Sequence, residues 1–237
     1  LAKTGTPTMG GLIFLTVIAV LTLIASITSP QLLAPLGVGL GFGVIGFIDD
    51  YIKVIKKRSL GFKAYQKMAA QLLVTGGLIV YHMMTTELAT EMLVPFTGGY
   101  YLNLGWLFIP FMLCFILGTV NGVNLTDGVD GLSTSVTIAV MGFFLVVDQT
   151  IGFGLSPLLA IIVGALFGFL IYNSHPAALF MGDTGSLAIG GFVASVAVLM
   201  KMPLFIVLVG FIYLAEVISV ILQVGYYKRT KKRLFKM

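Results

Sequence analysis

Charged residues are scarce in this chain of 237 residues: they make up 10% of it, whereas 58% of the residues are apolar. A soluble domain carries roughly a quarter charged residues, so this composition excludes a water-soluble globular protein and a disordered chain. Cysteine occurs once and histidine twice, which excludes a disulfide framework and a zinc site built from these residues. The mean hydropathy of +1.07 indicates an integral membrane protein instead.

Long apolar runs fill most of the chain. Lipid offers backbone polar groups no water partner, so runs of membrane length are expected to form helices. They predict an all-α, polytopic bundle of about eight transmembrane helices, forming one domain over residues 1–237. Residues 87–105, which are aromatic and β-branched around two glycines, predict a small hairpin outside the membrane. The expected spans are 10–28, 34–51, 66–85, 106–122, 132–149, 157–173, 186–200 and 204–225.

The basic residues are distributed unevenly along the chain. If successive helices alternate in direction, all 14 lysines and arginines except Lys201 lie on the same side as residues 53–67. The positive-inside rule assigns that side to the cytoplasm. The partner expected of these segments is the lipid bilayer, and nucleic acid is not expected.

Glycine is concentrated in the span 34–51. Four-residue spacings such as Gly37/Gly41 let two helices approach closely in lipid. We therefore interpret these glycines as packing positions rather than as part of a catalytic site.

Several polar clusters lie on the predicted cytoplasmic side. Asp49 and Asp50 end one span, where the negative end of the helix dipole disfavours carboxylates unless Lys53 or a metal ion compensates. Neighbouring residues diverge by about 100° on a helix, so the two acids are expected to have different partners. Residues 121–131 contain more asparagine, aspartate and glycine than a connecting turn requires. A solvated helix end and a plain turn are the alternative interpretations.

Asp183 lies just before the predicted span 186–200, at a helix start whose free N–H groups attract anions. A carboxylate there would repel a phosphate unless a divalent cation bridges the two, and a simple helix cap is the alternative. Hard carboxylate ligands without cysteine or histidine indicate Mg²⁺ or Mn²⁺. The clusters together predict a site for a cation and phosphates on the cytoplasmic side.

Glu216 is an acidic residue within the last predicted span, and Ser219 and Gln223 share its helical face. This stripe could line a groove or serve contacts between helices. It also admits a cation-coupled transporter as a rival function. Transporters place their binding groups near the membrane midplane, whereas the acids here gather at one face, so we rank an enzyme first.

Four short motifs resemble those of the bacterial phospho-N-acetylmuramoyl-pentapeptide-transferases, within the polyprenyl-phosphate N-acetylhexosamine-1-phosphate transferase superfamily. The resemblance runs from residue 3 to about residue 236. The aspartate motifs mark the superfamily, and the first motif and the string SLAIGG at 186–191 favour this branch. The motifs are TPTMGG at 6–11, DDYIK at 49–53, NLTDGVDGL at 124–132 and FMGDTGSL at 180–187.

The resemblance implies an enzyme that moves phospho-N-acetylmuramoyl-pentapeptide from its UDP carrier to undecaprenyl phosphate. The products would be lipid I, a precursor in peptidoglycan synthesis, and UMP. The resemblance further implies Mg²⁺ dependence, a multi-pass place in the bacterial cytoplasmic membrane and an active site facing the cytoplasm; it also allows a homodimer. A sister transferase acting on UDP-N-acetylglucosamine is the alternative within the superfamily.

Roles for individual residues follow from the same resemblance. The position matching Asp183 binds Mg²⁺, and those matching Asp49 and Asp50 are essential for catalysis; we assign activation of the lipid phosphate to Asp50. The other matching positions are expected to hold phosphates, the nucleotide or the sugar. They are Lys3, Thr8, Lys53, Lys57, Lys67, Asn124, Asp127, Asp130, Asn173, Phe180 and Gln223.

Family members are expected to have ten helices and a cytoplasmic histidine triplet after the ninth. Residues 1–237 show eight expected spans and no such triplet. We therefore expect this chain to lack the first helix, the triplet and the last helix of the family, and to show little activity by itself.

Overall fold

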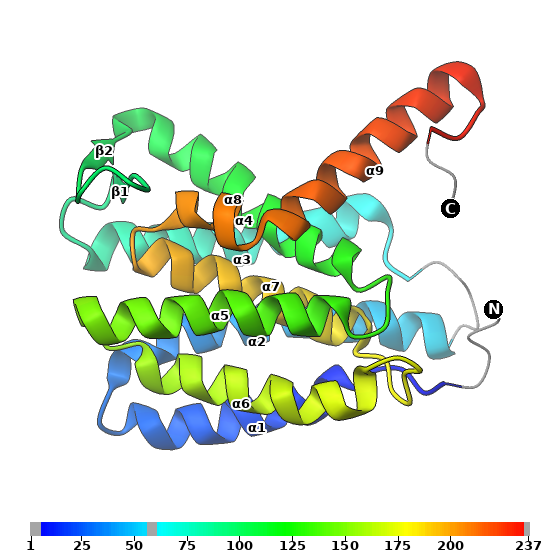
Figure 1. Ribbon diagram of the computed structural model, residues 1–237, viewed down its shortest axis with the longest axis horizontal. Helices are drawn as coiled ribbons and strands as arrows, with labels where there is room; N and C mark the ends of the chain where they lie inside the picture. The colour runs from blue at the N-terminus through cyan, green and yellow to red at the C-terminus, as the bar shows by residue number, and fades with distance from the viewer. Residues whose placement is uncertain (1–5, 56–60, 235–237) are drawn as a thin grey trace.

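The structure, a computed structural model, describes residues 6–55 and 61–234. These residues form a bundle of helices with one short hairpin (Figure 1). Seven of the described helices are long and apolar enough to cross a membrane, and α1 is a shorter apolar helix of 16 residues. The predicted all-α membrane bundle is therefore confirmed. The helices are α1 Gly11–Ser26, α2 Leu33–Ile55, α3 Ala64–Thr85, α4 Phe108–Thr126, α5 Leu132–Ile151, α6 Ser156–Asn173, α7 Gly182–Leu199, α8 Ile206–Val209 and α9 Phe211–Thr230.

The predicted hairpin is present at one end of the bundle (Figure 1). Strands β1 (Glu91–Leu93) and β2 (Tyr101–Asn103) pair antiparallel. Gly98 and Gly99 lie in the turn between them with φ values of +70° and +102°, a conformation that glycine adopts without strain. The hairpin is attached to the bundle through Lys201, whose carbonyl accepts a hydrogen bond from Leu93 and whose ammonium donates to the carbonyl of Glu87.

Helix α7 occupies the centre of the bundle, and 83% of its residues are buried. It contacts α2 more extensively than any other helix, and glycines on α2 make this close approach possible. A Cβ added at Gly46 would lie 2.0 Å from the backbone oxygen of Asp183, and one at Gly39 would lie 2.4 Å from the ring of Phe192. The end of α2 therefore lies directly against the start of α7.

Gly37 and Gly41, given above as an example of this spacing, do not face α7. A Cβ at Gly37 would meet open space, and one at Gly41 would meet only the side chain of Val74. The α7-facing positions are Gly39, Gly43 and Gly46, which follow the helical repeat on a different face of α2. Packing, rather than catalysis, is still the role that these glycines have.

Three helices run further into the polar clusters than the hydropathy predicts. Helix α2 continues to Ile55, α4 continues to Thr126, and α7 begins at Gly182. The apolar run ends before the helix does, because polar residues remain helical when partners on neighbouring helices satisfy their side chains. Asp49, Asp50, Asn124 and Asp183 are consequently held on helices. Other candidate site residues lie on segments outside the helices: Thr8, Asp127, Asp130 and Phe180.

The last predicted span, 204–225, is not one helix. It is broken at Gly210 into α8 and α9. The buried ring of Tyr213 lies where a Cβ at Gly210 would be, and its hydroxyl is 2.8 Å from the hydroxyl of Thr137. Beyond this break α9 leaves the bundle at an angle (Figure 1). Only 6% of the residues in its most apolar stretch of 18 are buried.

Candidate functional site

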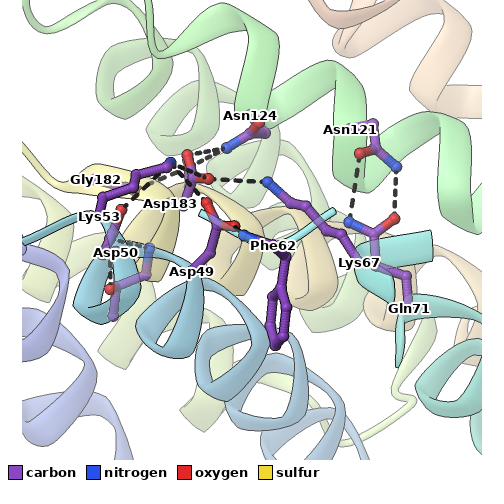
Figure 2. A network of polar contacts seen from close by, with 12 residues as sticks. Asp49, Asp50, Lys53, Phe62, Lys67, Gln71, Asn121, Asn124, Gly182 and Asp183 are labelled. Atoms are coloured by element: carbon purple, nitrogen blue, oxygen red, sulfur yellow. Dashed lines mark hydrogen bonds and ion pairs between the residues drawn. The ribbon is translucent and has the colours of Figure 1, made fainter. Parts of the chain in front are cut away.

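Three aspartates from two helices meet at the end of the bundle opposite the hairpin (Figures 1 and 2). Asp49 and Asp50 come from the end of α2, and Asp183 comes from the start of α7. Each offers a carboxylate oxygen, and these oxygens all lie within 4.8 Å of one another. The close packing of Gly46 on the backbone of Asp183 brings the two helix ends together.

Two lysines lie among the carboxylates. The ammonium of Lys53 is 2.6 Å from Asp49 Oδ2 and 2.9 Å from Asp183 Oδ2. The ammonium of Lys67, which reaches in from α3, is also 2.9 Å from Asp183 Oδ2. With every group ionised, three negative charges face two positive charges, so the cluster has room for further positive charge.

The adjacent acids on α2 have different hydrogen-bond partners, as their helical spacing predicts, although the ammonium of Lys53 lies 2.6 Å from Asp49 and 3.9 Å from Asp50. Asp49 Oδ1 accepts a hydrogen bond of 2.6 Å from the backbone N–H of Phe62. Asp50 Oδ2 accepts two hydrogen bonds from Thr184, one from its backbone N–H at 2.9 Å and one from its hydroxyl at 2.7 Å. A Cβ at Gly182, where φ is +70°, would lie 2.6 Å from the same oxygen, so glycine is needed there. Asp50 is thus fixed against the first turn of α7.

Asp183 is held from several helices at once. Its Oδ1 accepts a hydrogen bond of 3.1 Å from the amide of Asn124 on α4, and its Oδ2 accepts from Lys53 and Lys67. The amide of Asn124 also donates to the hydroxyl of Ser186 at 2.7 Å. The orientation of this carboxylate therefore depends on the relative placement of α2, α3, α4 and α7.

A cavity of about 410 Å³ opens beside these groups. Its volume lies within the range that small-molecule sites usually have. Its wall combines carboxylates, one ammonium, one amide and two glycines, which suits an anionic ligand accompanied by a cation. The lining residues are Thr8, Asp50, Lys53, Val54, Asn124, Leu125, Asp127, Gly128, Gly182 and Asp183.

Some residues predicted to bind substrate do not line this cavity. The amide of Asn173 accepts from the hydroxyl of Thr134 at 2.8 Å and donates to the carbonyl of Leu179 at 3.0 Å. Asp130 accepts hydrogen bonds from the ring of His175 and from the backbone N–H of Ala177. Both side chains thus contact the segment that joins α6 to α7, and their predicted role in substrate binding stays a prediction.

Two further predicted residues have hydrogen bonds in other parts of the structure. The backbone of Phe180 donates to the carbonyl of Pro7 and accepts from the N–H of Gly10, which ties the segment before α1 to the segment before α7. Gln223 is on α9, where its Oε1 accepts a hydrogen bond from the N–H of Leu234. Neither residue is among those that line the cavity.

Lys3 and Lys57 lie outside the described residues, so their predicted contacts with phosphate stay predictions. The sequence also missed partners that the structure reveals. The N–H of Phe62 and the two donors of Thr184 hold the acids of α2, yet a backbone donor leaves no trace in a sequence. The small residues of the motif at 180–187 were the available signal for Thr184.

Comparisons with known proteins agree with the motifs. The pattern described as "Glycosyl transferase family 4" matches residues 32–201, and "Phospho-N-acetylmuramoyl-pentapeptide-transferase signature 1" matches residues 3–15. The protein named "Phospho-N-acetylmuramoyl-pentapeptide-transferase" in Clostridium novyi (strain NT) is 48% identical over 99% of this chain and 73% of its own length.

Other proteins of the same name are similar to this chain to the same degree. The one from Clostridioides difficile (strain 630) is 46% identical over 100% of this chain and 74% of its own length. The one from Acetivibrio thermocellus is 47% identical over 99% of this chain and 72% of its own length. At this level of identity across essentially the whole sequence, the chain belongs to the phospho-N-acetylmuramoyl-pentapeptide-transferase family.

Proposed function

We propose that this protein transfers phospho-N-acetylmuramoyl-pentapeptide from its UDP carrier to undecaprenyl phosphate in the bacterial cytoplasmic membrane, forming lipid I and UMP. One observation supports this most. In a chain of this family, three carboxylates and two lysines meet beside a cavity at one end of a membrane bundle. Such a site can receive a soluble nucleotide sugar from water and a lipid phosphate from the membrane.

The reaction brings anionic groups together, so charge is the main obstacle. An oxygen of the lipid phosphate attacks the sugar-bound phosphorus of the nucleotide sugar, and the bond to the UMP oxygen breaks. Lys53 and Lys67 bring positive charge to the place where the phosphates would meet. Asn124 and Thr8 add polar groups along the cavity wall and help to orient the phosphates.

Asp50 is the residue that we assign to proton removal from the lipid phosphate. It lines the cavity, and its Oδ2 is occupied by the two hydrogen bonds from Thr184. Its Oδ1 lies 3.9 Å from the ammonium of Lys53, which leaves this oxygen as the proton acceptor. Asp49, by contrast, is bound to Lys53 and to the N–H of Phe62, and we give it the role of positioning Lys53.

We further propose that the site takes Mg²⁺. Carboxylate oxygens are hard ligands, and those of Asp49, Asp50 and Asp183 lie within 4.8 Å of one another. The surplus negative charge of the cluster favours a cation, and Asp183 is its principal ligand in this assignment. When bound, the ion would neutralise phosphate oxygens and polarise the phosphoryl group.

The positions of the basic residues support a cytoplasmic site. Lys53 and Lys67 lie at the end of the bundle that holds the aspartates, whereas Lys201 lies at the hairpin end. By the positive-inside rule, this distribution favours an acidic cavity on the cytoplasmic side, where UDP-linked sugars are available.

A choice between two donors tests the proposed function. The protein, expressed from its complete reading frame and reconstituted in lipid, is given undecaprenyl phosphate with either UDP-N-acetylmuramoyl-pentapeptide or UDP-N-acetylglucosamine. We expect UMP release and a lipid-linked product with the first donor, and neither in an Asp183→Asn control. Transfer from UDP-N-acetylglucosamine alone would instead establish the sister activity, and vesicle uptake without any lipid-linked product would indicate a transporter.

A further inference from the structure

An amide pair joins α3 to α4 within the membrane, one helical turn from the acidic cluster (Figure 2). Asn121 Nδ2 donates to Gln71 Oε1 at 2.9 Å, and Gln71 Nε2 donates to Asn121 Oδ1 at 3.3 Å. Asn121 also donates to the carbonyl of Leu117 in the preceding turn of its own helix. Gln71 is 1% exposed and Asn121 is half-buried, so the pair is largely shielded from water on the α3 side.

The two amides are placed next to the residues that hold Asp183. Gln71 follows Lys67 by four residues on α3, and Asn121 precedes Asn124 by three residues on α4, so each pair shares a helical face. Lys67 binds Oδ2 of Asp183 at 2.9 Å, and Asn124 binds Oδ1 at 3.1 Å. The three contacts close a ring through α3, α4 and α7.

Apolar packing alone holds α3 weakly. In its most apolar stretch of 18 residues, only 28% of the residues are buried, against 83% for α7. Hydrocarbon side chains resemble the surrounding lipid, so polar contacts and close packing set the rotation of a peripheral membrane helix. Rotating α3 by one residue would turn Lys67 by about 100° and leave both amides of the pair without partners.

We propose that Gln71 and Asn121 form a positioning clamp, which sets the rotation of α3 so that Lys67 and Asn124 engage opposite oxygens of Asp183. Neither amide touches the reacting groups; both act through the lysine and the asparagine one turn away. The clamp therefore determines whether the ammonium of Lys67 lies beside the carboxylate of Asp183. Its catalytic consequence rests on the proposed transferase function, whereas its effect on Lys67 does not.

The first test measures the accessibility of Lys67 and needs no transferase activity. The protein in lipid nanodiscs is labelled with an amine-reactive ester, and the labelling rate of each lysine is measured by mass spectrometry. We expect Gln71→Met to raise the rate at Lys67 severalfold and to leave Lys53, which binds the same carboxylate from α2, unchanged. Equal increases at both lysines would reveal general loosening and would overturn the clamp, as would no increase at Lys67.

Rescue and a matched control sharpen this test. The exchanged pair Gln71→Asn with Asn121→Gln keeps one long and one short amide across the same gap, and we expect it to restore slow labelling of Lys67. Thr75→Val is the control, because Thr75 lies one turn further along the buried face of α3 and its hydroxyl has no hydrogen-bond partner among the described residues. We expect that substitution to leave the labelling rates as they are.

The second test measures turnover. We expect Gln71→Met to lower kcat on the order of tenfold with little change in KM for the nucleotide sugar, because the clamp affects charge placement in the transition state. In a Lys67→Gln background, Gln71→Met should lower kcat no further. If the two losses multiply instead, Gln71 does not act through Lys67. A wild-type protein that makes no lipid I would refute the proposed function, while the labelling result would still decide the clamp.

Discussion

Replacing Asp50 with asparagine removes one charge from the acidic cluster while keeping the shape of the side chain. The amide oxygen can still accept both hydrogen bonds from Thr184, at the 2.9 Å and 2.7 Å that the carboxylate now has. Bonds to a neutral acceptor are weaker than those to a charged one, so we expect a loss of stability of about 1 kcal/mol. The amide nitrogen then replaces Oδ1 near Lys53 and has no capacity to take a proton.

The expected effect on catalysis is larger than the effect on stability. Removing a general base typically costs about a hundred- to ten-thousand-fold in rate, which is about 3–5 kcal/mol of activation free energy. Asp50→Asn should therefore lower kcat by that factor, while the Mg²⁺ concentration at half-maximal rate changes much less than it does in Asp183→Asn. This pattern is typical of a group that acts in the transition state.

Asp183→Asn is the matched comparison, because it removes the same charge at a different place. Asp183 accepts hydrogen bonds from Lys53, Lys67 and Asn124, so the substitution weakens contacts with donors on three helices. We expect this variant to need more Mg²⁺ for half-maximal rate, and high Mg²⁺ to restore part of the rate.

A Mg²⁺ titration of UMP release measures both variants in one assay. Near-normal turnover in Asp50→Asn would show that Asp50 is not the proton acceptor. If excess Mg²⁺ restores Asp50→Asn and Asp183→Asn is indifferent to the metal, the two assigned roles are reversed.

Three further predictions concern the bundle. Gly46→Ala should lower the thermal unfolding midpoint sharply, since its Cβ would lie 2.0 Å from a backbone oxygen of α7. Gly37→Ala should leave the midpoint unchanged or raise it, since nothing lies within 4 Å of its Cβ. Equal midpoints for the two variants would contradict the α2–α7 packing. Asp148→Ala should lower the stability by about 1–2 kcal/mol without lowering kcat per folded molecule, because this buried carboxylate accepts hydrogen bonds from the first residue of α6, far from the cavity; a selective loss of kcat would be unexpected. In a chain whose cysteine is replaced, a membrane-impermeant thiol reagent should label Tyr100→Cys from outside cells and should not label Lys63→Cys; the reverse would invert the topology.

The sequence by itself determined the class of protein and its place in a membrane. Scarce charge and long apolar runs leave only a helical bundle, because lipid cannot hydrogen-bond an open backbone. The sides on which lysine and arginine lie predict the orientation, and the short aspartate motifs were enough to indicate the family. These features are sums over single residues or short strings, so they need no knowledge of how the helices pack.

The helix faces could not be predicted in the same way. The spacing that favours close packing occurs at Gly37/Gly41 and also at Gly39/Gly43, yet only the second pair faces α7. Both choices have the same spacing along the helix. Only the helix that packs alongside decides which face meets it, and this depends on side chains from a distant part of the chain.

The site shows the same division between sequence and tertiary structure. Asp50 and Asp183 are recognisable as candidates from their motifs, but their meeting depends on how closely α2 approaches α7. Asn173 stays a predicted ligand for substrate, and its amide also has Thr134 and a backbone carbonyl as partners, which the sequence did not indicate. The sequence shows which hydrogen-bonding groups a polar residue has, but it does not show which partners satisfy them. Those partners are brought within reach only by packing, and packing therefore decides which polar residues support the fold and which face the cavity.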